Sequence, residues 1–470
     1  MPDPRTPNPP RTSFRRRAWL VAVLSLGGCA VAPLPTLQRD TPAAWQHAER
    51  DDAPAPDLHG WWKAFGDAGL DRLVDAALAD NLGIAQARLR IEAARMLDAH
   101  ANDASLPQFG FRTYAEPTPD SSASYFQAGF DAKWEFGLFG RAQSRARVSA
   151  GELGIAESDG LAARVSVVAE VVRAYVELRG AERRAALLEQ VAARARHKRE
   201  LLATRESLRL AAAREVARAR AEEAVAQAAL AEPRAAIVRA RRQLAALLAR
   251  DDEDVVGSGA PLVLGATAAT ADVLPADLLR TRPEIRRAEY EVEKAAGELG
   301  IAESDLYPHV GLGGALTYAA RVIGHTRLSD ADGIVTFGPA IEIPLFDWGA
   351  RRAAKDARAN SLQASVLAYR QAVLDGVTEV ETAMAALHER TRASRALQDG
   401  VVALDDEARS TATLQHLGLA DGLDLAASDT AALQAQLDLL QAEQERSLAF
   451  VALYKALGGA PLPSADDGAG

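Results

Sequence analysis

The stretch RPEIRRAEYEVEKAAGELGIAESDLYPHVGL (Arg282–Leu312) combines helical spacing of apolar residues with a proline that introduces an alternating strand pattern. A second version, NLGIAQARLRIEAARMLDAHANDASLPQFGF, lies in the first half of the chain at Asn81–Phe111. The two versions align at matching apolar and proline positions, namely Ile84 on Ile285, Ala87 on Ala288, Ala94 on Ala295 and Pro107 on Pro308. A repeat of this length indicates a duplicated half of the protein and not a short-period solenoid.

Strand signals follow each version of the repeat. Apolar residues alternate with polar or small ones from Phe126 to Phe136, and a period of two recurs from Val310 to Tyr318. We therefore predict one strand pair at about 108–137 and a second at about 309–345. The segments that close the two pairs also match: WEFGLFGRAQSRA (Trp134–Ala146) and IEIPLFDWGARRA (Ile341–Ala353) align Phe139 with Phe346.

Long helices are predicted on both sides of each strand pair, because the remaining segments carry helical spacing. A helix of about 65 residues reaches roughly 100 Å at ~1.5 Å per residue, farther than a single globular domain requires. One seam alternates steps of four and three residues, which is typical of a coiled coil: Leu161, Val165, Val168, Val172 and Tyr175. The helices are predicted at 67–104, 140–204, 213–248 with a kink at Pro233, 277–305, 349–415 and 421–457.

The chain supplies only four predicted strands, each of about the ~9–11 residues that cross a bilayer at a tilt. Four strands do not close into a barrel, and unpaired backbone in lipid costs several kcal/mol for each lost hydrogen bond. If these strands lie in a membrane, other chains must complete a barrel of eight, twelve or sixteen strands. The alternative is two ordinary hairpins on a soluble helical bundle.

The composition excludes several classes of function. The formal net charge is −10, whereas a nucleic-acid-binding protein normally carries a clustered positive patch. The sequence contains no P-loop, no HExxH zinc motif, no paired CxxC motif and no GxSxG nucleophile elbow. We therefore expect no enzymatic activity, no metal site, no cofactor and no nucleic-acid partner. The missing nucleotide site means that energy for any transport comes from a partner.

The single cysteine, Cys29, ends a basic and then apolar segment that is typical of a secretory signal. Residues 1–28 resemble a bacterial lipoprotein signal, which implies cleavage between Gly28 and Cys29 and a diacylglycerol and N-acyl lipid on Cys29. Ala30 follows instead of an aspartate, so the resemblance implies delivery to the outer membrane. The alternative is an incidental thiol. Residues 29–66 are predicted to form a lipid-anchored extended tether. Its aromatic cluster is expected to pack onto the body: Trp61, Trp62 and Phe65.

The chain is similar to the outer-membrane efflux proteins of the TolC and NodT type, in the lipoprotein branch that serves RND-type pumps. The motifs that carry the resemblance are WWKAFGDAGLDRLV (Trp61–Val74), WEFGLFGR (Trp134–Arg141), Leu278–Leu312, PLFDWGARR (Pro344–Arg352) and LYKALGGA (Leu453–Ala460). The resemblance implies an α+β membrane protein, a homotrimer whose twelve-stranded outer-membrane β-barrel takes four strands per chain and continues into a long periplasmic α-helical barrel. It also implies docking to a periplasmic adaptor (membrane fusion) protein and an inner-membrane pump.

These observations predict a domain organisation and a function. The first repeat occupies 67–250, an equatorial linker 251–273, the second repeat 274–460 and a flexible tail 461–470. The predicted function is a passive exit duct for substrates exported by an inner-membrane pump, as in multidrug resistance. One alternative is a duct for type I protein secretion or metal efflux. Another is a structural coiled-coil lipoprotein or a periplasmic adaptor.

The periplasmic aperture is predicted where the long helices reverse. GLADGLDL, which begins at Gly418, matches the tip motif of the family, and Arg209 stands at the corresponding place in the first copy. Family members commonly carry an aspartate nine residues after that glycine, where this chain has Ala427. We expect Asp421 and Asp424, which share one helix face, to constrict the aperture or to favour cations there. The alternative is that both residues cap the helix that follows.

Overall fold

The computed structural model describes residues 34–37, 41–46, 57–116, 125–251, 282–323 and 327–460. The chain divides into two compact units, each built from parts of both repeats. The predicted signal, Cys29, nearly all of the linker and the tail lie outside the described residues. One unit contains Met1–Leu37, Ala93–Gly154 and Glu289–Ala368, and the other contains Gln38–Glu92, Ile155–Ala288 and Tyr369–Gly470.

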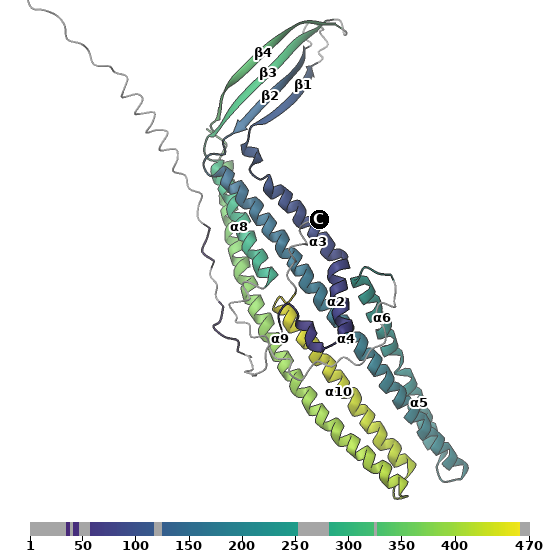
Figure 1. The fold of residues 1–470 in the computed structure, drawn as a ribbon. Helices are drawn as coiled ribbons and strands as arrows, with labels where there is room; N and C mark the ends of the chain where they lie inside the picture. Colours follow the sequence, from purple (N-terminus) through teal and green to yellow (C-terminus); the bar gives the residue numbers. More distant parts are fainter. Residues whose placement is uncertain are drawn as a thin grey trace, which may run out of the picture. The chain divides into compact units, whose positions relative to one another are not determined.

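The first unit contains one antiparallel sheet in the order β1-β2-β3-β4 (Figure 1). β1 and β2 form one hairpin, β3 and β4 form another, and β2 pairs with β3, so the two repeats meet at the centre of the sheet. Both predicted strand pairs are confirmed, although β3 and β4 are longer than predicted, at 15 and 16 residues. The strands span Gln108–Glu116 (β1), Tyr125–Glu135 (β2), His309–Ile323 (β3) and Arg327–Glu342 (β4).

The two faces of the sheet differ in polarity, because side chains alternate along each strand. The strand register aligns apolar residues in rows across one face: Phe111, Phe130, Leu316 and Val335 in one row, and Phe109, Ala132, Gly314 and Phe337 in the next. Rows on the opposite face hold mainly polar or small residues: Gly110, Asp131, Ala315 and Thr336 in one, and Arg112, Gly129 and Thr317 with Ile334 of β4 in the next.

Four helices contribute to the first unit: α3 (Leu82–Ala99), α4 (Arg141–Ser207), α8 (Pro283–Ser304) and α9 (Ala350–His416). Glycines allow α4 and α8 to approach closely. A Cβ atom on Gly297 would lie 2.8 Å from the carbonyl oxygen of Ser144, and Gly154 faces the ring of Tyr290. Larger side chains at these two glycines would push the helices apart.

The second unit is helical and is packed around the predicted seam of α4. All five seam residues are buried, which confirms the coiled-coil spacing. The cluster Trp61, Trp62 and Phe65 is also buried, as predicted, and the rings of Trp61 and Tyr454 stack with centroids 5.5 Å apart. No helix in the described ranges is long and apolar enough to cross a membrane. The further elements are η2 (Trp61–Phe65), α2 (Ala68–Asp80), α5 (Ala213–Ala228), α6 (Ala231–Leu247) and α10 (Gly422–Ala456).

Two predicted helices are each broken into two. The helix predicted at 67–104 stops at Asn81, whose side-chain oxygen accepts hydrogen bonds from the N–H groups of Gly83 and Ile84 at 2.9 and 3.2 Å. The amide of Asn81 donates to the carbonyl of Leu247 at 2.8 Å, so the break is also held by a distant helix. The predicted kink at Pro233 is a break three residues earlier, and the proline lies in the first turn of α6, where its missing N–H is tolerated.

The predicted alignment of Phe139 with Phe346 is wrong by two residues. Phe139 and Trp348, each followed by a glycine, share a left-handed φ of 55° and 59°. Strand register agrees, since Gln108 pairs with Lys133, and the equivalent His309 pairs with Glu342. Lys133 and Glu342 are as far apart in the sequence as Phe139 and Trp348 are. One constant shift in residue number therefore places β2 on β4 and α4 on α9.

Candidate functional site

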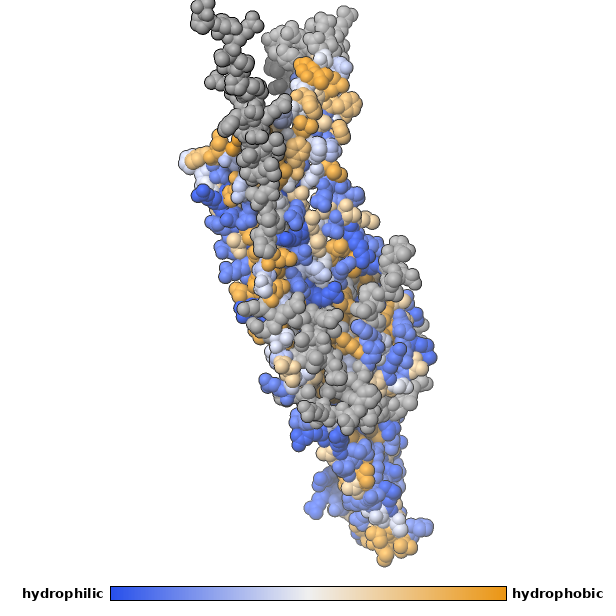
Figure 2. Space-filling model, turned by 60° about the vertical axis from the view of Figure 1, so that its left-hand side comes forward, coloured by the Kyte–Doolittle hydropathy of each residue, from blue (hydrophilic) through white to orange (hydrophobic). Residues whose placement is uncertain are grey.

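The apolar face of the sheet is exposed in the single chain. Phe109, Phe337 and Val335 expose 82%, 77% and 75% of their surface, and hydrophobic residues gather over the sheet in Figure 2. Monomeric soluble proteins rarely leave a continuous apolar patch of this extent in water. The face is therefore suited to contact with lipid.

The outer strands of the sheet, β1 and β4, each have one free edge within the described residues. Backbone N–H and C=O groups along such an edge need partners when the strand lies in lipid. The arrangement therefore favours completion of the sheet by further strands.

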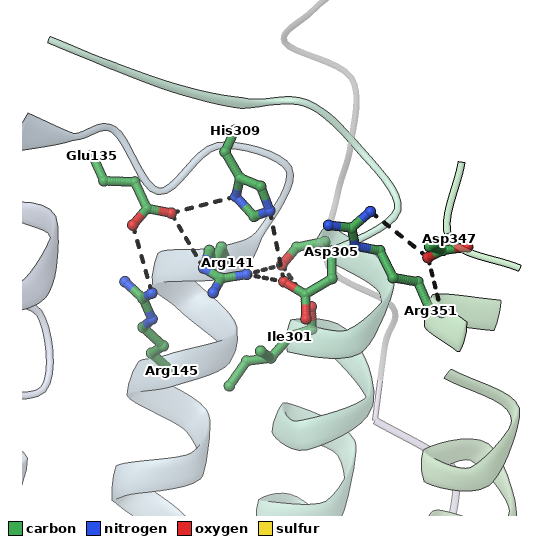
Figure 3. A network of polar contacts seen from close by, with 9 residues as sticks. Glu135, Arg141, Arg145, Ile301, Asp305, His309, Asp347 and Arg351 are labelled. Carbon is green, nitrogen blue, oxygen red and sulfur yellow. Dashed lines mark hydrogen bonds and ion pairs between the residues drawn. The ribbon is translucent and has the colours of Figure 1, made fainter. Parts of the chain in front are cut away.

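A polar network joins the base of the sheet to the helices below it (Figure 3). Arg141 at the start of α4 contacts Glu135 of β2 at 3.3 Å and also pairs with Asp305, which follows α8. His309 of β3 lies between these carboxylates, with its nitrogens 3.5 Å from Glu135 and 3.8 Å from Asp305. Arg145 approaches Glu135 at 3.9 Å. Residues from β2, β3, α4 and the turn after α8 thus fix the direction in which the helices leave the sheet.

The second repeat fixes the start of α9 differently. Asp347 accepts hydrogen bonds from the N–H groups of Gly349 and Arg351 at 3.0 and 3.1 Å. The Arg351 side chain also lies 3.7 Å from the Asp347 carboxylate (Figure 3). This helix therefore begins on a cap within its own repeat. Sequence reasoning singled out neither this cap nor the network around Arg141.

The helix reversals share one backbone motif. Two residues after the end of α4, Arg209 has a φ of 59°, and the N–H of Leu210 donates to the carbonyl of Arg205 at 2.7 Å. Two residues after the end of α9, Gly418 has a φ of 75°, and the N–H of Leu419 donates to the carbonyl of Leu414 at 2.8 Å. A left-handed residue of this kind commonly ends a helix, and a side chain there costs about 1–2 kcal/mol. Arg209 thus occupies the position of Gly418 under strain.

Asp421 and Asp424 cap α10. Asp421 accepts hydrogen bonds from the N–H groups of Leu423 and Asp424 at 2.5 and 3.2 Å, and the Asp424 carboxylate accepts from the N–H of Asp421 at 3.0 Å. The N–H of Leu423 and the guanidinium of Arg205, 3.1 Å away, hold the pKa of Asp421 below its ordinary value. Because Arg205 belongs to α4, this ion pair links the two reversals. The capping alternative therefore has direct support, whereas Ala427 lies within α10 and carries no charge.

Exposed leucines flank both reversals. Their exposed fractions lie between 64% and 74%, and hydrophobic residues are visible at the lower end of the helices in Figure 2. Exposed apolar side chains beside a polar surface are typical of contact sites for another protein. The residues are Leu208 and Leu210 at the first reversal, and Leu417 and Leu419 at the second.

The sequence matches the family model of the outer membrane efflux protein in two stretches, residues 73–250 and 274–459. The chain belongs to this family. It is 27% identical to nodulation protein T of Rhizobium leguminosarum bv. trifolii over 467 residues, which covers 95% of this chain and 97% of that protein. It is 28% identical to the solvent efflux pump outer membrane protein SrpC of Pseudomonas putida, with 94% and 97% of the two chains covered.

The fold agrees with that assignment. The outer-membrane channel OprN superposes with a TM-score of 0.77 at 28% identity, covering 92% of this chain and all of the other. The chain is therefore an outer-membrane efflux channel of the α+β type, with a four-stranded membrane sheet and a helical body in the periplasm. Members of this family act as channels and not as enzymes.

Proposed function

We propose that this efflux protein is the homotrimeric exit duct of a tripartite system. Three copies of the four-stranded sheet give a closed barrel of twelve strands, which satisfies the free edges of β1 and β4. The open sheet with its exposed apolar face is the observation that supports this proposal most, because the face favours lipid over water and the free edges are unfavourable in lipid until further strands pair with them. The duct conducts passively, and an inner-membrane pump of the RND type supplies the energy.

The partner at the helix reversals is a periplasmic adaptor. The four exposed leucines at Leu208, Leu210, Leu417 and Leu419 offer an apolar contact on each hairpin, six in a trimer. A structural lipoprotein or an adaptor does not require a lipid-facing sheet, so the sheet favours the duct. A pump for proteins or metal ions can be distinguished from a pump for small molecules by identifying the adaptor that crosslinks to the helix reversals.

The protein is anchored to the outer membrane by lipid on Cys29 as well as by its sheet. The lipoprotein-like signal that ends at Gly28 supports this proposal. Labelling cells with a radioactive fatty acid tests it. Label is expected in the native protein and not in a Cys29→Ala variant, and label retained in that variant contradicts the proposal.

Asp421 and Asp424 narrow the aperture in addition to capping α10. Three copies place six carboxylates around one axis, and the Arg205–Asp421 ion pair holds the two hairpins of each chain together. Loss of both carboxylates is expected to raise single-channel conductance and to reduce cation preference. Unchanged conductance, preference and divalent block in the Asp421→Ala/Asp424→Ala variant would leave capping as their whole role.

Two experiments test the function as a whole. The purified protein is expected to form trimers in detergent and to give stepwise conductance in planar bilayers. A folded trimer without conductance would instead indicate a structural bridge. Photocrosslinkers placed beside the exposed leucines in cells are expected to capture an adaptor of a small-molecule exporter. Capture of a type I secretion or metal-efflux adaptor would contradict the proposed cargo but not the proposed duct.

A further inference from the structure

In the sheet, one strand seam is complete, where a strand seam is the pairing of a strand of one repeat with a strand of the other. Each free edge of the sheet supplies one strand of a second such seam. Within the chain, β2 of the first repeat pairs with β3 of the second. The duplication makes β4 the equivalent of β2 and β1 the equivalent of β3. The two free edges therefore correspond to the two edges that already pair at the centre of the sheet.

We propose that the seam between two copies of the chain repeats the internal seam residue for residue. This proposal rests on the proposed trimer. Within the chain, Ala132 pairs with Gly314, and Lys133 pairs with Gly313. Replacing each residue by its equivalent in the other repeat gives the pairs between copies: Ile341 of one copy lies opposite Thr113 of the next, and Glu342 lies opposite Arg112.

The polarity of the faces supports this register. Ile341 follows Phe337 and Pro339 along the apolar face of β4, and Thr113 follows Phe109 and Phe111 along the apolar face of β1. A slip by one residue would turn the apolar residues of one copy toward the polar face of the other. The register taken from the duplication keeps the apolar faces of β1 and β4 on the same side of the sheet. The polarity of these two strands was not used to derive that register, so the agreement supports it.

Charge gives a second, independent check that also excludes a slip by two residues. Both Glu342 and Arg112 are exposed on the polar face of the single chain, and the Arg112 side chain is 80% exposed. The proposed register brings these opposite charges face to face, which stabilises a cross-strand pair. A register shifted by two residues places Gly110 or Tyr114 opposite Glu342 and leaves the carboxylate without this cation.

The helices below the sheet complement each other in the same way. Within the chain, Gly297 of α8 contacts the backbone of Ser144 and the side chain of Val148 on α4. The equivalent residues are Met96 on α3, which is 68% exposed, and the exposed Ala353 and Ala357 on α9. Met96 is larger than the glycine at the equivalent position, whereas Ala357 is smaller than the equivalent valine. The α3 face of one copy therefore fits the α9 face of another, with the larger side chain on α3 and the smaller one on α9.

Paired cysteines test the register in the full-length protein in its membrane. Cα atoms directly opposite in antiparallel strands lie ~4.5–5.5 Å apart, within the range of a disulfide, whereas diagonal positions lie ~7–8 Å apart. Oxidation of the Thr113→Cys/Ile341→Cys variant is expected to give reducible bands of two and three chains on a denaturing gel. Neither single variant is expected to give a three-chain band. The matched control Thr113→Cys/Pro339→Cys is expected to crosslink at least tenfold more slowly.

A faster reaction of the control pair than of the directly opposite pair would overturn the register. Charge reversal supplies a second measurement that does not need cysteines. Arg112→Glu is expected to lower the temperature at which the trimer dissociates in detergent, and adding Glu342→Arg is expected to restore it. A trimer that conducts but crosslinks in another register would refute this inference and leave the duct intact. A protein that is monomeric and forms no channels would refute the proposed function itself.

Discussion

Asp67 joins the start of α2 to the long helix α4, and its removal gives a quantitative test of the packing. Asp67 accepts hydrogen bonds from the N–H groups of Gly69 and Leu70 at 2.6 and 3.2 Å, which caps α2. It also accepts the hydroxyl of Tyr175 at 2.8 Å. The guanidinium of Arg179 donates to the same hydroxyl at 3.1 Å and lies over the tyrosine ring.

The expected cost of Asp67→Ala follows from these contacts. Loss of an N-cap costs about 1 kcal/mol, and loss of a hydrogen bond to a charged group costs about 1.5–3 kcal/mol. We therefore expect the free energy of unfolding to fall by about 3 kcal/mol. In a Tyr175→Phe background the hydrogen bond is already absent, so the same substitution should cost only the cap, about 1 kcal/mol.

Urea unfolding of the helical body, followed by circular dichroism in detergent, measures all four proteins of this cycle. Equal costs of Asp67→Ala in both backgrounds would refute the coupling between Asp67 and Tyr175. Burial raises the pKa of Asp67, but the hydrogen bonds from Tyr175, Gly69 and Leu70 outweigh it and hold the pKa below its ordinary value. The contribution is therefore complete above the ordinary aspartate pKa and is lost as pH falls through the folded-state pKa. An Asp67→Asn variant should lose that acid dependence.

Three further predictions concern glycines and caps. Gly154→Ala should destabilise the protein by about 1–3 kcal/mol because its methyl group meets a tyrosine ring on α8, whereas Gly400→Ala, with open space, should stabilise it by about 0.5–1 kcal/mol. Thermal melts that shift in the same direction for both would contradict this. Arg209→Gly should raise stability by up to about 1 kcal/mol and Gly418→Ala should lower it by a similar amount, as the same melts can show. Asp421→Ala should speed amide hydrogen exchange in the first turn of α10, and the difference from the native protein should shrink as pH falls through the lowered pKa of Asp421.

The regular elements were predictable because their signals are local. The period of two between Phe126 and Phe136 and the seam through Val168 each follow from one continuous segment. The break at Asn81 was not predictable in this way, because the carbonyl that holds its side chain belongs to Leu247 in another helix. The wrong alignment of Phe139 has a related cause. Phe139 and Phe346 are the same residue type, but their backbone conformations differ.

The candidate site divides along the same line. Asp421 and Asp424 were recognised as possible caps because capping depends on a spacing of three residues. The partner Arg205 was not recognised, since it lies on another helix. The network of Glu135, Arg141 and His309 draws on elements from both repeats, so no local pattern marks it.

The polar face of the sheet has a consequence for what can pass. Along β3 the positions on this face are small, at Gly311, Gly313 and Ala315, whereas the neighbouring strand β2 carries Asp131, Lys133 and Glu135 on the same face. The small residues of β3 leave space beside the charged side chains of β2, so these charges stay accessible to solutes inside a barrel. The opening through the sheet should therefore respond to the charge of a solute through β2, while the small residues of β3 leave room for solutes of different size.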